Sequence, residues 1–476
     1  MENSINTEKR ALIVDLDGTF IKSDLLVESF LKLLKLNFLK AVKSLLYIPK
    51  GLSNFKNYIA KEVDLNIESI PKNKEVLDLI KTRDSYLVTA SNEKYAKQIH
   101  QSTNIFIKSF GSSSDLNLKG KNKLIFLKKE FTEFDYIGDS KADFPILLES
   151  NTAFTVNYNP KLVKKLNSQR KNLGKSEVVE LKKRENFFLN ILKALRVYQW
   201  PKNLLVFLPI LMAHELGDSK KLLATFFAFI CFCITASSIY LLNDLLDLDS
   251  DRVHSSKSKR VIAAGDISVF FSLMLASCLG VSSLILSLFL GLDFTFFILI
   301  YFLFNFFYSL FLKKVVILDI ILLSSFYGLR ILSGGAATET PISPWLLVFS
   351  LFFFFSLASM KRLSEVLKLQ QIKETKAKGR GYLVSDISLL ENFSITSSFL
   401  AVLVFSLYLN SKNVLKIYDN HQYLWFILPL ILYFLLRLVI QTKRGNLKED
   451  PVLYTLKDKL SYVICFLILI IIFMAK

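Results

Sequence analysis

Cysteine and histidine are scarce in this sequence, with four residues of each type among 476. Apolar runs contain all four cysteines, Cys231, Cys233, Cys278 and Cys465, and cysteine in such runs usually serves as a small hydrophobic side chain. No disulfide framework is therefore expected. His254 has neither a cysteine nor a second histidine at ligand spacing, so a zinc site is not expected either.

Acidic residues are also in deficit, because 41 Asp and Glu oppose 60 Lys and Arg and leave a net charge of +19. Such a balance can indicate nucleic-acid binding, but the basic residues gather between 158 and 184 and in alternate connections of the apolar half. That placement is typical of the positive-inside rule and of attraction to anionic lipids and acidic substrates. We therefore expect membrane lipids as partners and no nucleic acid.

The first ten residues, MENSINTEKR, lack the apolar core of a signal peptide, so the leading part of the chain is expected in the cytoplasm. Up to about Glu185, charged and apolar segments alternate as in a soluble protein. Beyond that residue come apolar runs of about 16 to 24 residues, the length that spans a bilayer. With 52% hydrophobic residues overall, the sequence predicts one soluble domain followed by one multi-pass membrane domain.

Residues 11–14 form a short apolar run that ends at Asp15, in the sequence DLDGT. A buried strand that leads into an acidic loop is where open α/β sheets place their chemistry. Further signals follow in order: YLVT ends at Thr89, KGKNK contains Lys123, and DYIGDSKAD contains Asp139 and Asp143. An aspartate can attack phosphorus only when a nearby cation and a metal held by other carboxylates counter the charges. All of these groups are present, so the pattern indicates phosphoryl transfer.

Over residues 10–160 these motifs resemble the haloacid dehalogenase phosphatase superfamily. The resemblance implies an α/β, Rossmann-type domain in which Asp15 is the nucleophile and Asp17 the general acid and base. It also implies that Thr89 is the phosphate-binding hydroxyl and that Lys123 neutralises the phosphoryl group. Mg²⁺ is expected to be held by Asp15, Asp17, Asp139 and Asp143. Residues 23–71, rich in Leu, Lys and Phe at helical spacing, are expected to form a helical cap.

Between the two halves, residues 158–184 are basic and weakly periodic, and we expect a linker there. Phe187 to Leu195 then form an apolar helical stripe that suits an interfacial helix or ordinary helix packing. The expected divisions are a soluble domain at 1–160, a linker with its interfacial helix at 161–190, and a membrane domain at 191–476.

The membrane half contains nine apolar segments, near 203–213, 221–242, 267–290, 294–312, 315–333, 345–360, 394–409, 424–440 and 460–475. With the N-terminus in the cytoplasm, the alternate connections rich in Lys and Arg face inward, and the C-terminus lies outside. The expected location is therefore the cytoplasmic (inner) membrane. This orientation places the soluble domain, the connection after the second segment and the basic loop after Lys361 on one side of the membrane.

The connection after the second segment contains the stretch 243–265, NDLLDLDSDRVHSSKSKRVIAAG. Asp244, Asp247 and Asp251 are spaced three and then four apart, so their carboxylates share one face if the helix continues through them. Carboxylates gathered at a membrane surface repel one another unless a divalent cation holds them, which favours Mg²⁺. Cations that can take phosphate oxygens follow at once: Lys257, Lys259 and Arg260. The stretch therefore predicts a Mg²⁺–diphosphate site.

Five motifs of this half resemble the UbiA-type intramembrane prenyltransferases over residues 190–476: LRVYQWPKN, the NDxxDxxxD stretch, YSLFLKKVVILD, GLRILSGGA and KRLSE. The resemblance implies an all-α fold of nine membrane helices around a central cavity, with a diphosphate bound through Mg²⁺. A second DxxxD pair is incomplete, because Leu323 stands four residues after Asp319. With its more basic lining, the half is more similar to the branch typified by decaprenyl-phosphate phosphoribosyltransferase. That branch implies phosphoribosyl diphosphate as donor and a polyprenyl phosphate as acceptor.

The resemblance also implies roles for single residues. The three aspartates hold Mg²⁺ on the diphosphate, and Asn243 positions the metal or a hydroxyl group. Phosphate or ribose contacts are expected from Arg252, His254, Lys257 and Arg260, and a merely solvated ring is the alternative for His254. The lipid phosphate or the donor's 5-phosphate is expected at Lys202, Lys313, Lys361 and Arg362. Arg330 lies within an apolar segment, so Asp319 or a bound phosphate is its expected partner.

A transferase of that branch would release a polyprenyl phosphoribose that still carries a 5-phosphate, and the soluble domain would remove it. Because both halves belong to one chain, the sequence predicts a bifunctional enzyme. Its product would lead to a lipid-linked pentose that serves as a donor for cell-envelope glycan. Two alternatives remain open. One is a prenyltransferase that moves a polyprenyl group from its diphosphate to an aromatic or other small acceptor, and the other is a soluble half that acts only as a docking module. The sequence does not indicate which oligomeric state the protein adopts.

Overall fold

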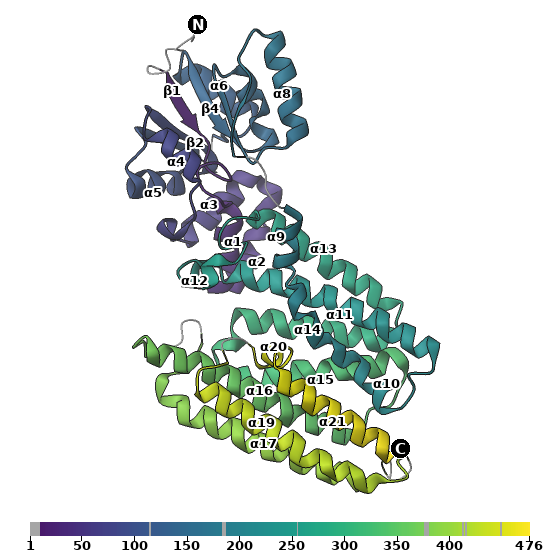
Figure 1. Cartoon of the computed structure of the whole chain (residues 1–476). Coiled ribbons are helices and arrows are strands. Elements are labelled where there is room, and N and C mark those ends of the chain that lie inside the picture. Colours follow the sequence, from purple (N-terminus) through teal and green to yellow (C-terminus); the bar gives the residue numbers. More distant parts are fainter. Residues whose placement is uncertain are drawn as a thin grey trace. The chain divides into compact units, whose positions relative to one another are not determined.

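A computed structural model describes residues 10–113, 116–182, 187–254, 256–375, 380–411, 414, 417–447 and 450–476. The chain divides into two compact units (Figure 1). Unit 1 comprises Met1–Leu195 and Tyr240–Ala276, and unit 2 comprises Arg196–Ile239 and Ser277–Lys476. The stretch 240–276, which the sequence assigns to the membrane half, therefore groups with the N-terminal residues.

Unit 1 is built on a six-stranded sheet of order β3-β2-β1-β4-β5-β6. Its strands are β1 (Ala11–Val14), β2 (Ser85–Asn92), β3 (Lys108–Ser112), β4 (Phe134–Gly138), β5 (Ala153–Val156) and β6 (Val179–Lys182). All of the pairings are parallel. The central strand has the sequence ALIV, and apolar side chains suit a strand that is covered on both faces. This is a doubly wound, Rossmann-like arrangement, so the predicted α/β class is confirmed.

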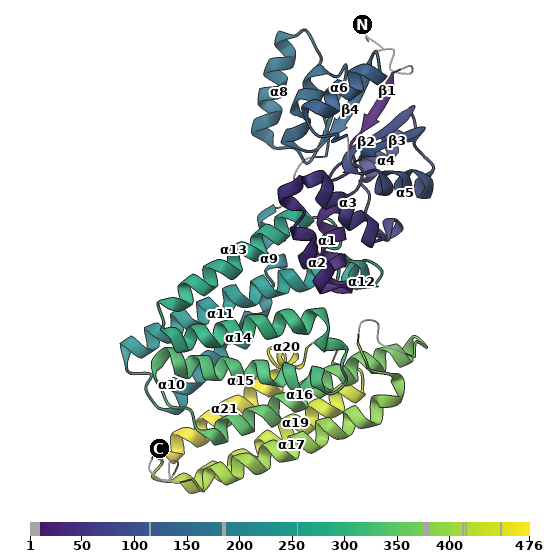
Figure 2. The ribbon, with the colours of Figure 1, turned by 180° about the vertical axis from the view of Figure 1, so that it is seen from behind.

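Helices cover both faces of the sheet: α4 and α5 lie on one side and α6 and α8 on the other (Figures 1 and 2). The helices of this part are α1 (Leu25–Leu36), α2 (Phe38–Leu45), α3 (Leu52–Glu62), α4 (Lys74–Ile80), α5 (Glu93–Thr103), α6 (Lys121–Glu130), α7 (Phe144–Glu149), α8 (Pro160–Asn172) and α9 (Phe187–Ala194). The first three form an insert between β1 and β2, and an antiparallel bridge between Ile21 and Lys72 closes it. The predicted helical cap is confirmed.

The stretch expected to be a linker is instead part of the sheet domain. Asn159 caps α8 by accepting from the amide of Lys161, and Pro160 occupies the first helical position, where its missing N–H costs nothing. The chain then returns as β6, which pairs with β5. The lysines of α8 line its exposed face, whereas Arg170 is buried, and this mixture of exposed and buried basic residues hid the helical period in the sequence.

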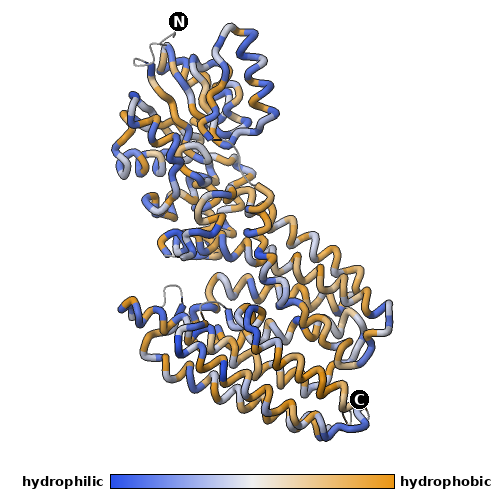
Figure 3. The backbone as a smooth tube through the Cα atoms, in the orientation of Figure 1, coloured by the Kyte–Doolittle hydropathy of each residue, from blue (hydrophilic) through white to orange (hydrophobic). Residues whose placement is uncertain are grey.

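Unit 2 is all-helical, apart from its connections. Its elements are η4 (Val197–Phe207), α10 (Leu208–Met212), α14 (Leu292–Leu310), η6 (Leu312–Lys314), α15 (Leu318–Thr338), α16 (Pro344–Gln371), η7 (Val384–Asp386), α17 (Ile387–Leu409), η8 (His421–Phe426), α19 (Ile427–Lys443), α20 (Pro451–Thr455) and α21 (Lys459–Ala475). Two helices, α11 (Ser219–Leu246) and α13 (Val269–Leu288), begin in one unit and end in the other. Apolar residues predominate along these helices (Figure 3).

Seven helices among the described residues are long and apolar enough to cross a membrane, and they make the chain a multi-pass membrane protein. Two of the nine predicted segments fall short. The first, 203–213, is divided between η4 and α10, where Pro201 and Pro209 interrupt regular helical hydrogen bonding. The last, α21, has only 17 residues.

Helix α16 is central to unit 2 and packs against α15, α17 and α19. Ser343 precedes it and Pro344 begins it, a combination typical of helix starts. Tyr327 of α15 stacks on Phe354 of α16, with ring centroids 4.1 Å apart. This packing fixes the faces of α15 and α16 that carry the charged residues of this unit.

Candidate functional site

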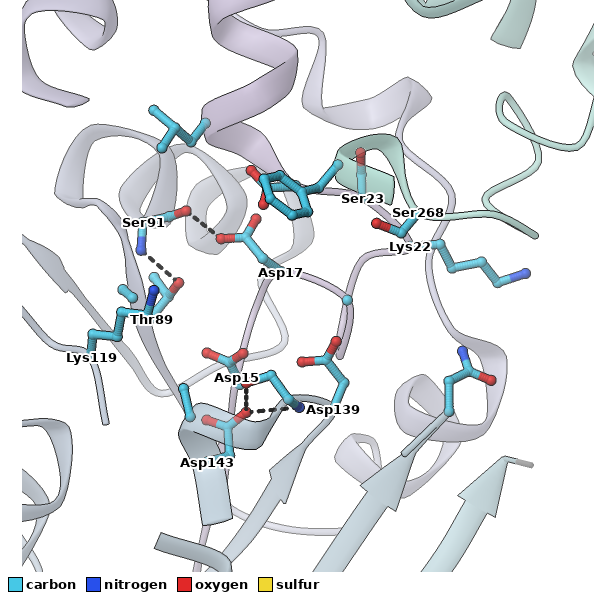
Figure 4. A pocket seen from close by; sticks show the side chains of 18 of the residues that line it. Asp15, Asp17, Lys22, Ser23, Thr89, Ser91, Lys119, Asp139, Asp143 and Ser268 are labelled. Atoms are coloured by element: carbon cyan, nitrogen blue, oxygen red, sulfur yellow. Dashed lines mark hydrogen bonds between the residues drawn. The ribbon is translucent and has the colours of Figure 1, made fainter. Parts of the chain in front are cut away.

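Three buried or half-buried carboxylates gather at the carboxyl edge of the sheet in unit 1 (Figure 4). Asp15 directly follows β1, while Asp139 directly follows β4 and Asp143 lies in the short turn after it. One oxygen of each lies within 4.8 Å of the others. Because β1 and β4 are adjacent and parallel, their ends meet at the same edge, as the sequence predicts.

Lys123 of α6 lies among these acids. Its Nζ is 2.6 Å from Oδ1 of Asp15 and 3.8 Å from Oδ1 of Asp143. Tyr136 completes the group, since its hydroxyl accepts from Lys123 at 3.1 Å and donates to Asp143 at 2.7 Å. Sequence reasoning missed Tyr136, which lies in the middle of the fully buried strand β4.

The charges of this group do not cancel. Burial raises the pKa of Asp15 to about 6 despite the neighbouring Lys123, and burial together with Asp15 and Asp143 raises the pKa of Asp139 well above its usual range. Carboxylates that repel one another in this way suit a divalent cation with oxygen ligands, such as Mg²⁺. Gly18 leaves the necessary room: a Cβ at this position would lie 2.0 Å from Oδ2 of Asp139.

Asp17 lies outside the three-carboxylate group. Its Oδ1 accepts from the amide of Leu25 at 3.0 Å, and its Oδ2 accepts from the hydroxyl of Ser91. The predicted side-chain contribution of Asp17 to a metal site is therefore not seen among the described acids. Burial raises the pKa of Asp17 to about 7, which suits a group that gives and takes a proton.

Thr89 is buried near the end of β2, and its Oγ1 accepts from the amide of Ser91 at 3.0 Å. It lines a cavity of about 790 Å³ together with the groups above. The structure thus brings all six predicted residues of the soluble half to one cavity, namely Asp15, Asp17, Thr89, Lys123, Asp139 and Asp143. Such an arrangement can bind a phosphoryl group, attack it and protonate a leaving oxygen.

The aspartate-rich stretch also lies in unit 1, but its helix is interrupted. Helix α11 ends at Leu246, and α12 (Leu248–Arg252) begins after Asp247. Arg260 bridges two of the acids, with its NH1 2.9 Å from Asp244 and 2.6 Å from Asp251. Asp247 instead meets Lys35 of the cap at 2.8 Å. The expectation of one continuous helix with three gathered carboxylates is corrected: two acids share an arginine, and the third pairs with the cap.

In this structure the three aspartates are thus paired with the side chains of Arg260 and Lys35. A lysine and an arginine neutralise carboxylates without the close oxygen packing that a divalent ion requires. Three carboxylates in one short segment are nevertheless a donor set suited to Mg²⁺, and binding there would release Asp247 from Lys35.

One face of α1 carries the contacts to this stretch. Glu28, Lys32 and Lys35 are spaced four and three apart, so they share a helical face. They pair with residues of complementary charge in the same order: Arg252, Asp249 and Asp247. The Arg252–Glu28 pair is bidentate, at 2.9 and 2.5 Å, and almost fully buried. Arg252 is thus engaged by the cap, and its predicted phosphate or ribose contact stays a prediction.

The remaining predicted residues of the stretch lie nearby in sequence. His254 accepts from the amide of Ser256 at 3.2 Å, which places its ring in a local turn. Lys257 begins the short helix η5 (Lys257–Lys259), and Asn243 lies one residue before Asp244 in α11. Their predicted roles as substrate contacts stay predictions.

In unit 2, Asp319 is the centre of a buried ionic group. Arg362 donates from Nε and NH2 to its two oxygens at 2.5 and 3.1 Å, and Arg380 lies 3.3 Å from Oδ1. The hydroxyl of Tyr308 donates to Oδ1 at 2.6 Å. Glu365 pairs with both arginines, at 2.8 and 3.2 Å. Sequence reasoning identified Asp319 and Arg362 but missed the other three residues.

Of the two partners expected for Arg330, Asp319 is not seen among the contacts of the described residues, and a bound phosphate stays a prediction. Its guanidinium donates to Oδ1 of Asn203 and to the hydroxyl of Tyr301, both at 2.8 Å. The rings of Tyr301 and Tyr327 lie 5.0 and 5.4 Å from its Cζ. Because two other arginines pair with Asp319, neutral hydrogen-bond acceptors and aromatic faces stabilise this cation instead.

Lys202 and Lys361 share one counter-ion, Asp450, at 2.8 and 3.0 Å. Burial would raise the pKa of Asp450, but the two lysines outweigh it and hold that pKa well below its usual range. Lys313 is buried in η6. In unit 2, Lys202 and Lys361 therefore belong to the group around Asp450, Arg362 belongs to the group around Asp319, and Lys313 lies in η6. The sequence analysis did not identify Asp450.

Comparison with known proteins agrees with this description. The UbiA prenyltransferase family matches residues 204–469. An uncharacterised protein of Sinorhizobium fredii is 34% identical over 467 residues, which cover 96% of this chain and 89% of that protein. A decaprenyl-phosphate phosphoribosyltransferase of Mycolicibacterium smegmatis is 33% identical over 292 residues, 59% of this chain and 90% of that protein.

A solved UbiA homologue from Archaeoglobus fulgidus, bound to DMAPP and Mg²⁺, aligns with 60% of this chain and 98% of its own, at a TM-score of 0.45 and 16% identity. The family match spans more than half of the sequence and most of the helices that suit a membrane. The chain belongs to the UbiA prenyltransferase family.

Proposed function

We propose that the protein transfers 5-phosphoribosyl from phosphoribosyl diphosphate to a polyprenyl phosphate and then removes the 5-phosphate from the product. The observation that carries the proposal is the group formed by Lys123, Asp15, Asp139 and Asp143 in a chain whose membrane half belongs to the UbiA family. The similarity to decaprenyl-phosphate phosphoribosyltransferases supports the choice of donor and acceptor.

In the transfer step, an oxygen of the lipid phosphate attacks C1 of the ribose. The bond between C1 and the diphosphate oxygen breaks, and pyrophosphate leaves. The nucleophile is already an anion at neutral pH, so no strong general base is needed. Asp244, Asp247 and Asp251 would hold Mg²⁺, which spreads the charge that develops on the leaving pyrophosphate.

Basic side chains of unit 2 have the complementary task of holding phosphate groups. Lys202 and Lys361 share a single carboxylate, so the group of three carries an excess positive charge. Arg362 adds a planar, bidentate donor that matches phosphate oxygens. These residues orient the acceptor phosphate or the 5-phosphate of the donor.

In the hydrolytic step, the oxygen of Asp15 that does not face Lys123 attacks the phosphorus of the 5-phosphate. The bond from phosphorus to the ribose 5-oxygen breaks, and Asp17 gives that oxygen a proton. Water then attacks the aspartyl phosphate, Asp17 takes the proton back, and inorganic phosphate is released. Lys123 and Thr89 contact the phosphoryl oxygens, and Mg²⁺ held by Asp15, Asp139 and Asp143 would supply further positive charge there.

The test uses the purified full-length protein in detergent with Mg²⁺, phosphoribosyl diphosphate and a polyprenyl phosphate. We expect release of both pyrophosphate and inorganic phosphate by the natural protein, of pyrophosphate alone by Asp15→Asn, and of neither by Asp247→Asn, since hydrolysis needs the transferred product. Pyrophosphate release only from a prenyl diphosphate and an aromatic acceptor would overturn the choice of substrates. Equal phosphate release by the natural protein and Asp15→Asn would overturn the phosphatase assignment.

A further inference from the structure

The cavity that contains the carboxylate group is larger than a phosphoryl group requires. Its volume is about 790 Å³, and its lining extends from the sheet edge to residues of α9 and of the segment before α13. All of these residues belong to unit 1. A substrate that fills this cavity must therefore offer more than a single phosphomonoester.

A second group of cations lines the cavity away from Asp15. Lys22 lies in the loop before the cap, and Lys182 ends β6. Figure 4 shows Lys22 beside Ser23 and Ser268, apart from Asp15 and Asp143. Within the described part of the chain, neither ammonium group makes an ion pair. Both are half-buried, so bulk water solvates them incompletely.

The two lysines line the same cavity, and their like charges act against each other. Burial lowers the pKa of Lys22, and the charge of Lys182 lowers it further, while Asp266 acts in the opposite direction. Lysine pairs that share a partly dry cavity are typical of sites for an anion.

The backbone holds both lysines in place. Gly265 has a φ of +73°, and a Cβ there would lie 2.4 Å from Cβ of Lys22 and 2.8 Å from its carbonyl oxygen. Only glycine allows this close approach. Lys182 is fixed by strand pairing with Val156, and its carbonyl accepts from the amide of Asn157 at 2.9 Å. The fold therefore fixes the backbone positions from which both lysines line the cavity.

Aromatic side chains line the cavity beyond the lysines. Phe187 of α9 contacts Phe271 of α13, with ring centroids 5.2 Å apart. Phe270 also lines the cavity and is 53% exposed. Helix α13 is one of the seven candidate membrane spans. The wall thus continues from a polar cavity to an apolar helix suited to lipid.

We infer that Lys22 and Lys182 form a second anion subsite that binds the phosphodiester of a lipid-linked substrate, while the phosphomonoester of the same molecule lies at Asp15. The inference rests on the proposed function and adds the substrate determinant of its hydrolytic step. A polyprenyl-phosphoryl-5-phosphoribose has a phosphomonoester at one end of the pentose, a phosphodiester at the other and a lipid beyond it. The carboxylate group, the lysine pair and the aromatic wall occur together in the cavity lining and match these three parts.

The test compares two substrates of the full-length protein in a detergent free of phospholipid: farnesyl-phosphoryl-5-phosphoribose, which has both phosphates, and ribose 5-phosphate, which has one. In Lys22→Met and in Lys182→Met, the KM for the farnesyl substrate is expected to rise about tenfold, the effect of losing one charge-assisted hydrogen bond. The KM for ribose 5-phosphate is expected to stay within about twofold of the natural value. Lys161→Met, on the exposed face of α8 and outside the cavity, is the matched control.

Rescue by Lys22→Arg and Lys182→Arg is expected, because arginine keeps the charge. Unchanged KM values for both substrates in the Met variants, or equal rises for both, would overturn the subsite while leaving phosphatase activity in place. A defect that appears only in vesicles with an anionic phospholipid would assign the lysines to a bulk headgroup and overturn the inference. Hydrolysis of neither substrate by the natural protein would overturn the proposed function itself.

Discussion

The contact between the cap and the aspartate-rich stretch allows a quantitative prediction. The side chains of Arg252 and Glu28 are 2% and 4% exposed, and two hydrogen bonds join them. Replacing Arg252 with Met leaves Glu28 as a buried charge without its partner. Removal of one partner from a buried ion pair typically costs about 3–5 kcal/mol. We expect α1 and α12 to separate more often by the corresponding factor, about 150- to 5,000-fold.

Hydrogen exchange of the full-length protein in detergent measures this change. The amides of α1 and α12 are expected to exchange faster in Arg252→Met, while those of the central strands β1 and β4 keep their protection, because only local opening is favoured. The double variant Glu28→Gln/Arg252→Met is expected to recover part of the protection, since no unpaired charge then remains.

The neighbouring pair provides a matched control. Lys32 and Asp249 are 26% and 41% exposed, so Lys32→Met is expected to cost only about 0.2–1 kcal/mol. If Arg252→Met and Lys32→Met accelerated exchange equally, burial would not be the source of the contact's stability, and the reasoning would fail.

Three further predictions concern the polar groups of the two units. Gly18→Ala places a Cβ against Asp139 at a φ of +76°, so phosphate release is expected to fall at least about 100-fold, with pyrophosphate release unchanged, in the coupled assay. Mg²⁺ at a concentration of about 100 times its dissociation constant is expected to raise the free energy of unfolding of unit 1 by about 2.7 kcal/mol. In denaturant unfolding experiments with and without Mg²⁺, Asp139→Asn should gain less stability from the metal than the natural protein does. Asp319→Asn removes the anion shared by Arg362 and Arg380, so a melting experiment in detergent should show destabilisation of about 3–5 kcal/mol, and an unchanged melting temperature would contradict the assignment of that ionic group.

The candidate site of unit 1 could be predicted from the sequence because several of its residues lie at or near the ends of strands. Asp15, Thr89 and Asp139 each end or follow a recognisable apolar run, and parallel strands bring such positions to one edge. Tyr136 escaped because its side chain faces the site from within β4, where an aromatic residue is ordinarily core.

The partners of the charged residues could not be predicted. Lys35 and Asp247 lie 212 residues apart, and nothing in the local sequence connects them. Arg330 binds Asn203 and aromatic rings, and Asp450 serves two lysines from distant helices. Such pairings depend on helix packing, whereas spacing along the chain reports only which side chains share a face. The strand β6 was missed because VELK is short and only half of its residues are apolar.

The place of residues 240–276 in unit 1 has a consequence for biosynthesis. The sheet and cap are complete once Leu195 has been made, but residues 265–271 of the cavity wall are translated only after α11 and α12. If the nascent N-terminal domain folds first, its cavity lacks this part of the wall until the first long membrane helix has been made. A fragment cut near residue 195 would resemble that state and would bind its ligands less selectively than the finished enzyme.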